Sequence, residues 1–176
     1  MFVHQQHLAG MRGLLRGHQS IDPPQEVVSA VTALATGNTV THVLCTSSSG
    51  EVHTTWTVVG LLASGHLMHV AATADIPGWH AHTGSSAGQL DIKIEATCHV
   101  IGDVTSIRLT HVQAIPTSAS DEWTAINTRW RVHFNDGDAF SIPANRYPTD
   151  EELTAAEAII AALIGVAPVA PTPSVS

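Results

Sequence analysis

Histidine is the residue type whose placement in this sequence most invites a chemical role, since the 176 residues include twelve histidines. His80 and His82 are two apart, so on an extended segment both rings face the same side. Neutral imidazole suits zinc, iron, copper and nickel, and the pair is therefore a candidate metal site. Such a site usually needs at least three protein ligands, and Asp75 and His111 are candidates for completing it. Because spacing alone does not bring these groups together, we favour ordinary loop and surface histidines and predict no cofactor.

Three further histidines, His53, His99 and His133, fall on the polar faces of three predicted strands. If those strands are neighbours, the rings share one surface that titrates at about pH 6.5. Scattered, solvent-facing rings are the simpler interpretation, and we favour it.

Two short motifs suggest catalysis or metal binding only superficially. Residues 84–88, Gly-Ser-Ser-Ala-Gly, match the G-x-S-x-G pattern of serine hydrolases, whose chemistry needs a strand before the serine and a helix after it. Here a strand-like run follows from Leu90 instead. Residues 135–138, Asn-Asp-Gly-Asp, lack the ligand spacing and terminal glutamate of a calcium-binding loop, and we predict a hairpin turn there. We therefore predict that the protein is not an enzyme.

Tryptophans divide into two groups by their surroundings in the sequence. Trp56 and Trp130 alternate in phase with valines, which predicts that both belong to the core. Trp79 and Trp123 stand next to predicted loops, which favours partial exposure. Because exposed aromatic residues anchor many interfaces, the candidate binding residues are Trp79, Trp123, His80 and His82.

The elements that must position these side chains are mainly strands. From residue 39 to residue 142 apolar and polar residues alternate, and turn-forming dipeptides such as Ser64-Gly65 separate the runs. The pattern predicts seven strands, at residues 39–47, 51–62, 66–74, 89–101, 104–115, 123–134 and 139–142. Their connections are too short for parallel crossovers, so we predict an antiparallel meander.

One helix is predicted on each side of the strands. The first is capped by Asp22, starts with Pro23 and ends at Gly37. The second begins with a capping box from Thr149 to Glu152. Its predicted apolar stripe consists of Leu153, Ala156, Ile160, Leu163 and Ile164.

This order of elements resembles the pleckstrin-homology-like superfold over about residues 39–165. Residues 129–163, RWRVHFNDGDAFSIPANRYPTDEELTAAEAIIAAL, carry most of the resemblance, because a short strand there leads into a helix. The resemblance implies an α+β, mainly β fold, in which a partly open barrel is capped by the C-terminal helix and binds lipid, peptide or protein. Phosphoinositide-binding members place basic residues around the first hairpin, whereas residues 46–53 contain no lysine or arginine. This difference argues against phosphoinositide binding.

Composition narrows the classes of partner. Apolar residues make up 44% of the chain and charged residues 12%, which excludes a disordered chain. A net charge of −8 repels phosphate backbones and argues against nucleic acid. No stretch approaches the roughly 20 apolar residues of a membrane span, and the N-terminus lacks the apolar core of a signal peptide. We therefore expect a cytoplasmic protein that does not bind membranes.

The predicted organisation is an N-terminal extension (residues 1–22), a single domain (residues 23–166) and a disordered, proline-rich tail (residues 167–176). We predict a non-catalytic protein-binding or assembly module, whose partner is another protein or further copies in a homo-oligomer. Two alternatives stay open. One is a small-molecule or metal-binding barrel that uses His80 and His82, and the other is a virus-derived structural or accessory protein.

Overall fold

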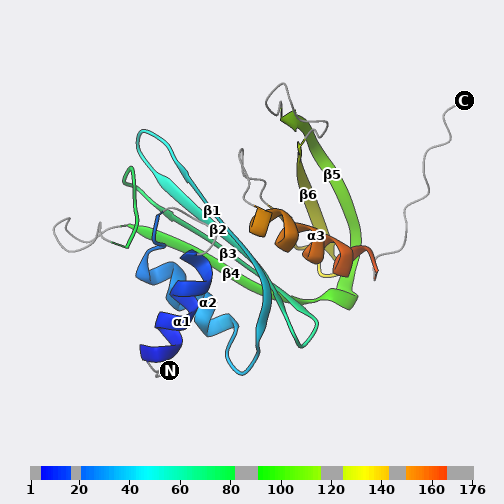
Figure 1. Cartoon of the computed structure of the whole chain (residues 1–176), viewed down its shortest axis with the longest axis horizontal. Helices are drawn as coiled ribbons and strands as arrows, with labels where there is room; N and C mark the ends of the chain where they lie inside the picture. The colour runs from blue at the N-terminus through cyan, green and yellow to red at the C-terminus, as the bar shows by residue number, and fades with distance from the viewer. Residues whose placement is uncertain (1–4, 17–20, 82–90, 116–124, 143–149, 166–176) are drawn as a thin grey trace, which may run out of the picture.

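A four-stranded antiparallel sheet forms the centre of the fold. The computed structural model describes residues 5–16, 21–81, 91–115, 125–142 and 150–165, and the statements below concern those residues. The central sheet pairs its strands in chain order: β1 (Val40–Ser49), β2 (Thr54–Leu62), β3 (His66–Ala74) and β4 (Ile92–Val100) (Figure 1). A short 3-10 turn, η1 (Ile101–Asp103), leads into a second antiparallel sheet of β5 (Val104–Ile115), β6 (Ala125–Phe134) and β7 (Ala139–Ile142).

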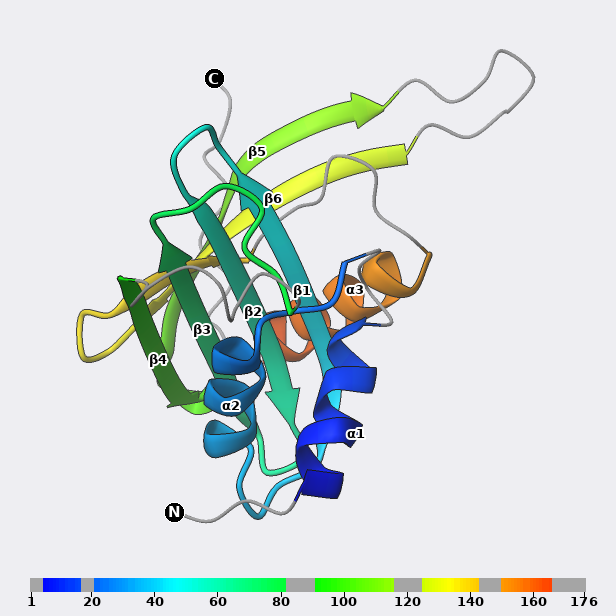
Figure 2. The same ribbon diagram turned by 90° about the vertical axis from the view of Figure 1, so that its left-hand side faces the viewer.

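Three helices cover the two faces of the central sheet. Helices α1 (Gln5–Arg16) and α2 (Gln25–Leu34) lie side by side on one face. Helix α3 (Asp150–Ile164) and the second sheet lie on the other face (Figures 1 and 2). Because side chains alternate between the faces of a strand, β1, β2 and β3 each contribute to two cores.

The first core lies between the central sheet and helices α1 and α2. Trp56, Val58, Met68 and Val70 point into it from β2 and β3, and Leu15 of α1 is fully buried there. Thus residues 5–16 of the segment predicted as an N-terminal extension form a helix that packs on the sheet. Gly60 makes room for Met68, since an added Cβ would overlap the Met68 Cε atom and the Met68 side chain would have to shift.

The second core joins the two sheets and α3. Leu44, Val59 and Leu67 of the central sheet face a group of buried residues from the second sheet and α3. That group consists of Val104, Val132, Phe134, Phe140, Ile142, Ala155, Ile159 and Leu163.

The seven predicted strands and the α+β, mainly β class are confirmed, but the single barrel is wrong. Strands β4 and β5 do not pair, and the chain passes between the sheets at η1. The meander is therefore divided into sheets of four and three strands, which diverge from η1 with α3 between them (Figure 1). The physical reason is packing: two separate sheets leave room for a helix in the core between them.

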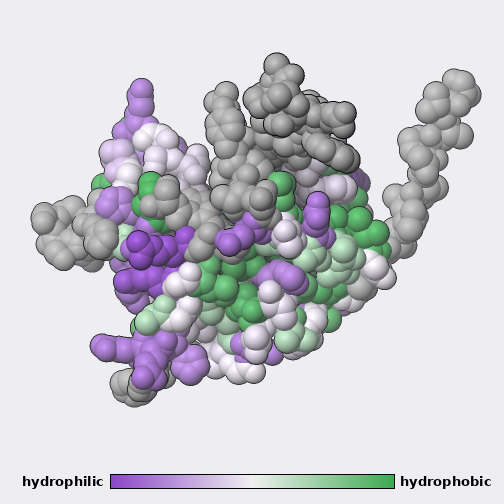
Figure 3. Space-filling model, in the orientation of Figure 1, coloured by the Kyte–Doolittle hydropathy of each residue, from purple (hydrophilic) through white to green (hydrophobic). Residues whose placement is uncertain are grey.

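Two local predictions for the helices are also corrected. Pro24 occupies the N-cap position of α2, whereas the Asp22 carboxylate forms an ion pair with Arg16 at 2.9 Å. The fully buried stripe of α3 is Glu152, Ala155, Ile159 and Leu163, about one residue out of phase with the predicted stripe. Ile164 is consequently 50% exposed. In the view of Figure 3, which has the orientation of Figure 1, hydrophobic residues gather over the middle and right of the molecule, where α3 and the lower part of β5 lie.

Candidate functional site

Trp79 lies in the core and not at the surface. Its side chain is 2% exposed, so the predicted exposure is wrong. The backbone N–H of Trp79 donates to the Thr54 hydroxyl at 3.2 Å, and the Trp56 indole N–H donates to the Trp79 carbonyl at 2.8 Å. The Thr54 hydroxyl donates in turn to the Ile76 carbonyl at 2.9 Å. These bonds satisfy the backbone of a loop that folds back on β2, which explains why a residue beside a loop is buried.

The structure describes only one of the other three predicted binding residues. His80 is half-buried, and both His82 and Trp123 lie outside the described residues. Within the described part of the chain, no group of three or more His, Cys, Asp and Glu side chains is placed to hold a metal ion. Because His82 lies outside the described residues, the metal site at His80 and His82 stays an untested alternative.

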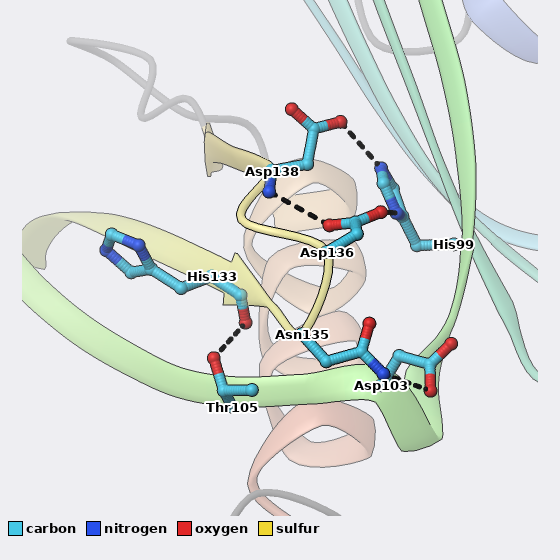
Figure 4. A network of polar contacts seen from close by, with 7 residues as sticks. All are labelled: His99, Asp103, Thr105, His133, Asn135, Asp136 and Asp138. Atoms are coloured by element: carbon cyan, nitrogen blue, oxygen red, sulfur yellow. Dashed lines mark hydrogen bonds and ion pairs between the residues drawn. The ribbon is translucent and has the colours of Figure 1, made fainter.

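His53, His99 and His133 do not share a surface. His53 precedes β2, and the strand register places it at the end of the central sheet opposite to His99. The side chains of His99 and His133 point in different directions (Figure 4).

His99 instead joins the two sheets. Its ring stacks on Phe134, with 4.0 Å between the ring centroids. Its Nδ1 atom lies 3.6 Å from Asp136 Oδ2 and its Nε2 atom 3.2 Å from Asp138 Oδ2 (Figure 4). Both aspartates belong to the turn between β6 and β7, which confirms the hairpin predicted at residues 135–138. The sequence shows the acidic turn but not that β4 lies beside it.

A second histidine extends this contact between the sheets. His69 of β3 stacks in parallel on Phe140, with 4.4 Å between the ring centroids. Burial lowers the pKa of His69, and the nearby carboxylates of Asp138 and Glu95 oppose this effect. We call His69, His99, Phe134 and Phe140 the inter-sheet seam. Because each imidazole is covered by a phenyl ring, the seam is a structural contact that fixes the second sheet on the first.

The pH dependence of stability tests the burial of His69. At pH values well above 6.5, the ordinary pKa of His69, the ring is neutral in both the folded and the unfolded state. As the pH falls from this value to the lower pKa of the folded state, the unfolded chain binds a proton that the folded chain does not. Stability should therefore decrease as the pH falls through this window.

His69→Gln should make the free energy of urea unfolding less dependent on pH between about pH 8 and about pH 5. His111→Gln changes an exposed position and is the control. Its free energy of unfolding should vary with pH as that of the wild type does. An equal pH dependence in the two variants would contradict the conclusion that buried His69 causes the loss of stability.

The hairpin of β5 and β6 extends beyond the rest of its sheet. The two strands pair from Val104 with Phe134 to Ile115 with Ala125, whereas β7 pairs only with residues 130–133 of β6. Beyond Trp130 the hairpin is therefore a two-stranded ribbon, which projects from the molecule in Figure 2. We call residues 104–115 and 125–134 the β5–β6 ribbon.

The two faces of the β5–β6 ribbon differ in chemistry. On one face Leu109 lies opposite Trp130 and Val112 lies opposite Thr128. Leu109 is 47% and Val112 56% exposed. The other face is basic, because residues that lie directly opposite each other share a face. There Arg108 lies opposite Arg131 and His111 opposite Arg129, and all four side chains are exposed.

The chemistry of the β5–β6 ribbon is only partly visible in the local sequence. The arginines at 129 and 131 are two apart in a predicted strand, which places them on one face. Nothing in the local pattern indicates that β7 pairs with β6 at Arg131 but not at Arg129, or that β5 adds a third arginine opposite Arg131.

Comparisons with known proteins give no relative: no family model matches the chain, and no curated protein or solved structure is significantly similar to it. Among the described helices, none has the length and apolar character needed to cross a membrane.

Proposed function

We propose that this protein is a non-catalytic protein-binding module whose docking element is the β5–β6 ribbon. The observation that carries the proposal is the apolar face of the ribbon, where Leu109 and Val112 are about half exposed although they lie within a strand. The end of the hairpin beyond Trp130, which carries Val112, has only two strands, and such a ribbon is at best marginally stable in water unless another layer covers it. A partner that covers this face would supply that layer.

The composition of the apolar face suits a protein partner. Trp130 is half-buried beside Leu109, and its indole N–H donates to the Thr128 hydroxyl at 3.1 Å. The ring is thus held in one orientation before any partner arrives, which reduces the entropy lost on binding. Tryptophan flanked by aliphatic side chains is typical of the residues that dominate binding energy at interfaces.

The free edge of β5 is a weaker candidate for docking than its face. Strand β5 pairs with β6 alone, so its outer edge is open to another strand. However, the register shifts near Thr105 and Thr110 mark bulges in this strand. Bulges twist an edge away from regular pairing and protect it from strand addition. We therefore place the partner on the face of the ribbon.

The order of elements supports the resemblance to the pleckstrin-homology-like superfold. Seven antiparallel strands are followed by one C-terminal helix, which is the order of elements on which the resemblance rests. Folds of this kind serve many binding functions, so the fold alone does not choose the ligand. The absence of lysine and arginine from residues 46–53 favours protein over phosphoinositide.

Site-specific photo-crosslinking in cells that produce the protein tests the proposal. A photoreactive phenylalanine analogue at Val112 should form an adduct with one defined protein, or with a second copy of this chain. The same analogue at Val52, which is 69% exposed in the turn before β2, is the control and should not.

A second experiment places the photoreactive group at position 130, so that Val112 can be substituted. There, Leu109→Thr combined with Val112→Thr should reduce the yield of the crosslinked adduct by at least about tenfold. Val52→Thr is the matched substitution and should leave the yield unchanged. Adducts that are equally frequent at Val112 and Val52, or that survive the double substitution, would contradict docking on this face.

A further inference from the structure

The face of the β5–β6 ribbon opposite Leu109 and Val112 concentrates positive charge in an acidic protein. The strands at 104–115 and 125–134 contain three of the seven lysine and arginine residues and none of the fifteen aspartates and glutamates. They therefore carry a formal charge of +3, against −8 for the whole chain. This contrast in charge distinguishes the ribbon from its surroundings.

The three arginines have no carboxylate partner within the described part of the chain. Ion pairs there involve Arg16 with Asp22, Lys93 with Glu95, and His99 with two aspartates, but not Arg108, Arg129 or Arg131. Arg108 and Arg131 are directly opposite each other, and like charges in that position destabilise a sheet. An anion bound across the strands would relieve this repulsion.

We infer that this basic face is a second contact surface of the ribbon and binds an extended acidic segment of polypeptide. The inference rests on the proposed function, because it assumes that the ribbon is the docking element. Arg129 and Arg131 are two apart on one strand, so their backbones are separated by about 6.6 Å. Alternate side chains of an extended peptide repeat at the same distance, and each carboxylate can accept two hydrogen bonds from one guanidinium.

A polypeptide fits this face better than a nucleic acid does. The net charge of −8 repels a long polyanion, since the repulsion acts on phosphates well beyond the ribbon. A short acidic segment contacts only the basic face and avoids most of that repulsion. His111, opposite Arg129, adds a further hydrogen-bond donor to this face.

A fluorescein-labelled peptide of six Glu-Thr repeats provides the direct test, with a peptide of six Gln-Thr repeats as its neutral control. Fluorescence anisotropy with the full-length protein should show binding of the Glu-Thr peptide at least about tenfold tighter than of the Gln-Thr peptide. The difference should shrink as NaCl rises from about 50 mM to about 500 mM, because salt screens exposed charges.

Variants locate the binding on the ribbon. Arg129→Gln combined with Arg131→Gln should weaken binding of the Glu-Thr peptide by at least about tenfold. Lys93→Gln is the control, since Lys93 is an exposed cation on a strand of the other sheet, and it should change the affinity less than about twofold. Equal affinity for the two peptides, or equal losses in the two variants, would overturn the inference.

Thermal unfolding separates a binding role from a structural one. If the arginines repel each other without a ligand, the double arginine variant should unfold at the same temperature as the wild type or about 1–3 °C higher. A decrease of several degrees would show that the arginines stabilise the ribbon itself, which would overturn the inference.

Two further outcomes decide the class of partner and keep the two proposals distinguishable. Arginine-dependent binding of a single-stranded DNA 20-mer that is tighter than binding of the Glu-Thr peptide would overturn the inference in favour of nucleic acid. In the second outcome, the crosslink at Val112 depends on Leu109 and survives the loss of both arginines, while the Glu-Thr peptide does not bind. That combination would overturn the inference of an acidic segment but leave the proposed docking on the apolar face intact.

Discussion

Trp56→Ala should lower the free energy of unfolding by about 3–5 kcal/mol, which is a large part of the stability of a typical domain. The Trp56 side chain is 1% exposed and lies at the centre of the core between the sheet and α1 and α2. Its removal leaves a cavity and also leaves the Trp79 carbonyl without its hydrogen bond from the indole. Urea unfolding followed by circular dichroism measures the loss.

Trp56→Phe separates packing from hydrogen bonding at this position. It keeps most of the ring but removes the N–H, so we expect a loss of about 1–3 kcal/mol, the cost of an unsatisfied buried carbonyl. Trp130→Phe is the matched control, because Trp130 is only half-buried and its indole bonds to a side chain on the same strand. If Trp130→Phe loses as much stability as Trp56→Phe, the hydrogen bond from Trp56 to the Trp79 carbonyl does not contribute the expected free energy.

Phe140→Ala should destabilise the protein by about 3–5 kcal/mol and weaken the attachment of the second sheet. Phe140 is 6% exposed, stacks on His69, and lies 5.5 Å from Phe134 between ring centroids. Because β7 has only four residues, Phe140 supplies much of what it buries. Hydrogen exchange should show protection lost first in β6 and β7, before the central sheet.

The same variant should change the titration of His69. Burial is the main cause of the lowered pKa of His69, and removal of the phenyl ring exposes the imidazole. The pKa of His69 measured by NMR should therefore rise in Phe140→Ala. Val112→Ala, at a position that is 56% exposed, should change stability by less than about 0.5 kcal/mol and leave His69 unaffected. An unchanged pKa of His69 in Phe140→Ala would contradict the conclusion that Phe140 buries the His69 ring.

Sequence patterns predicted the strands closely because the evidence for a strand is local. Three strands, at residues 66–74, 104–115 and 139–142, have the predicted bounds, and turn residues such as those at 135–138 lie between strands as expected. Helix α3 shows where this reasoning ends. Its periodicity gave the helix, but the buried stripe depends on the angle between the two sheets, so Ala155 and Ile159 are buried where Ala156 and Ile160 were expected.

The candidate sites also depend on long-range contacts that local sequence patterns do not show. Trp79 was assigned from its neighbours in the chain, but long-range hydrogen bonds to Thr54 and Trp56 draw its loop into the core. The contact of His99 with Asp136 and Asp138 joins residues from different sheets, and no local spacing encodes it.

The sequence by itself determined the class of the fold, the number of strands, and the alternation that puts Arg129 and Arg131 on one side of a strand. Tertiary structure decided that the meander divides after β4, that β7 pairs only with residues 130–133 of β6, and that Arg108 lies opposite Arg131 on an exposed face of the second sheet. The physical reason is range: alternation and turn chemistry act over a few residues, whereas exposure depends on which distant elements pack on each face.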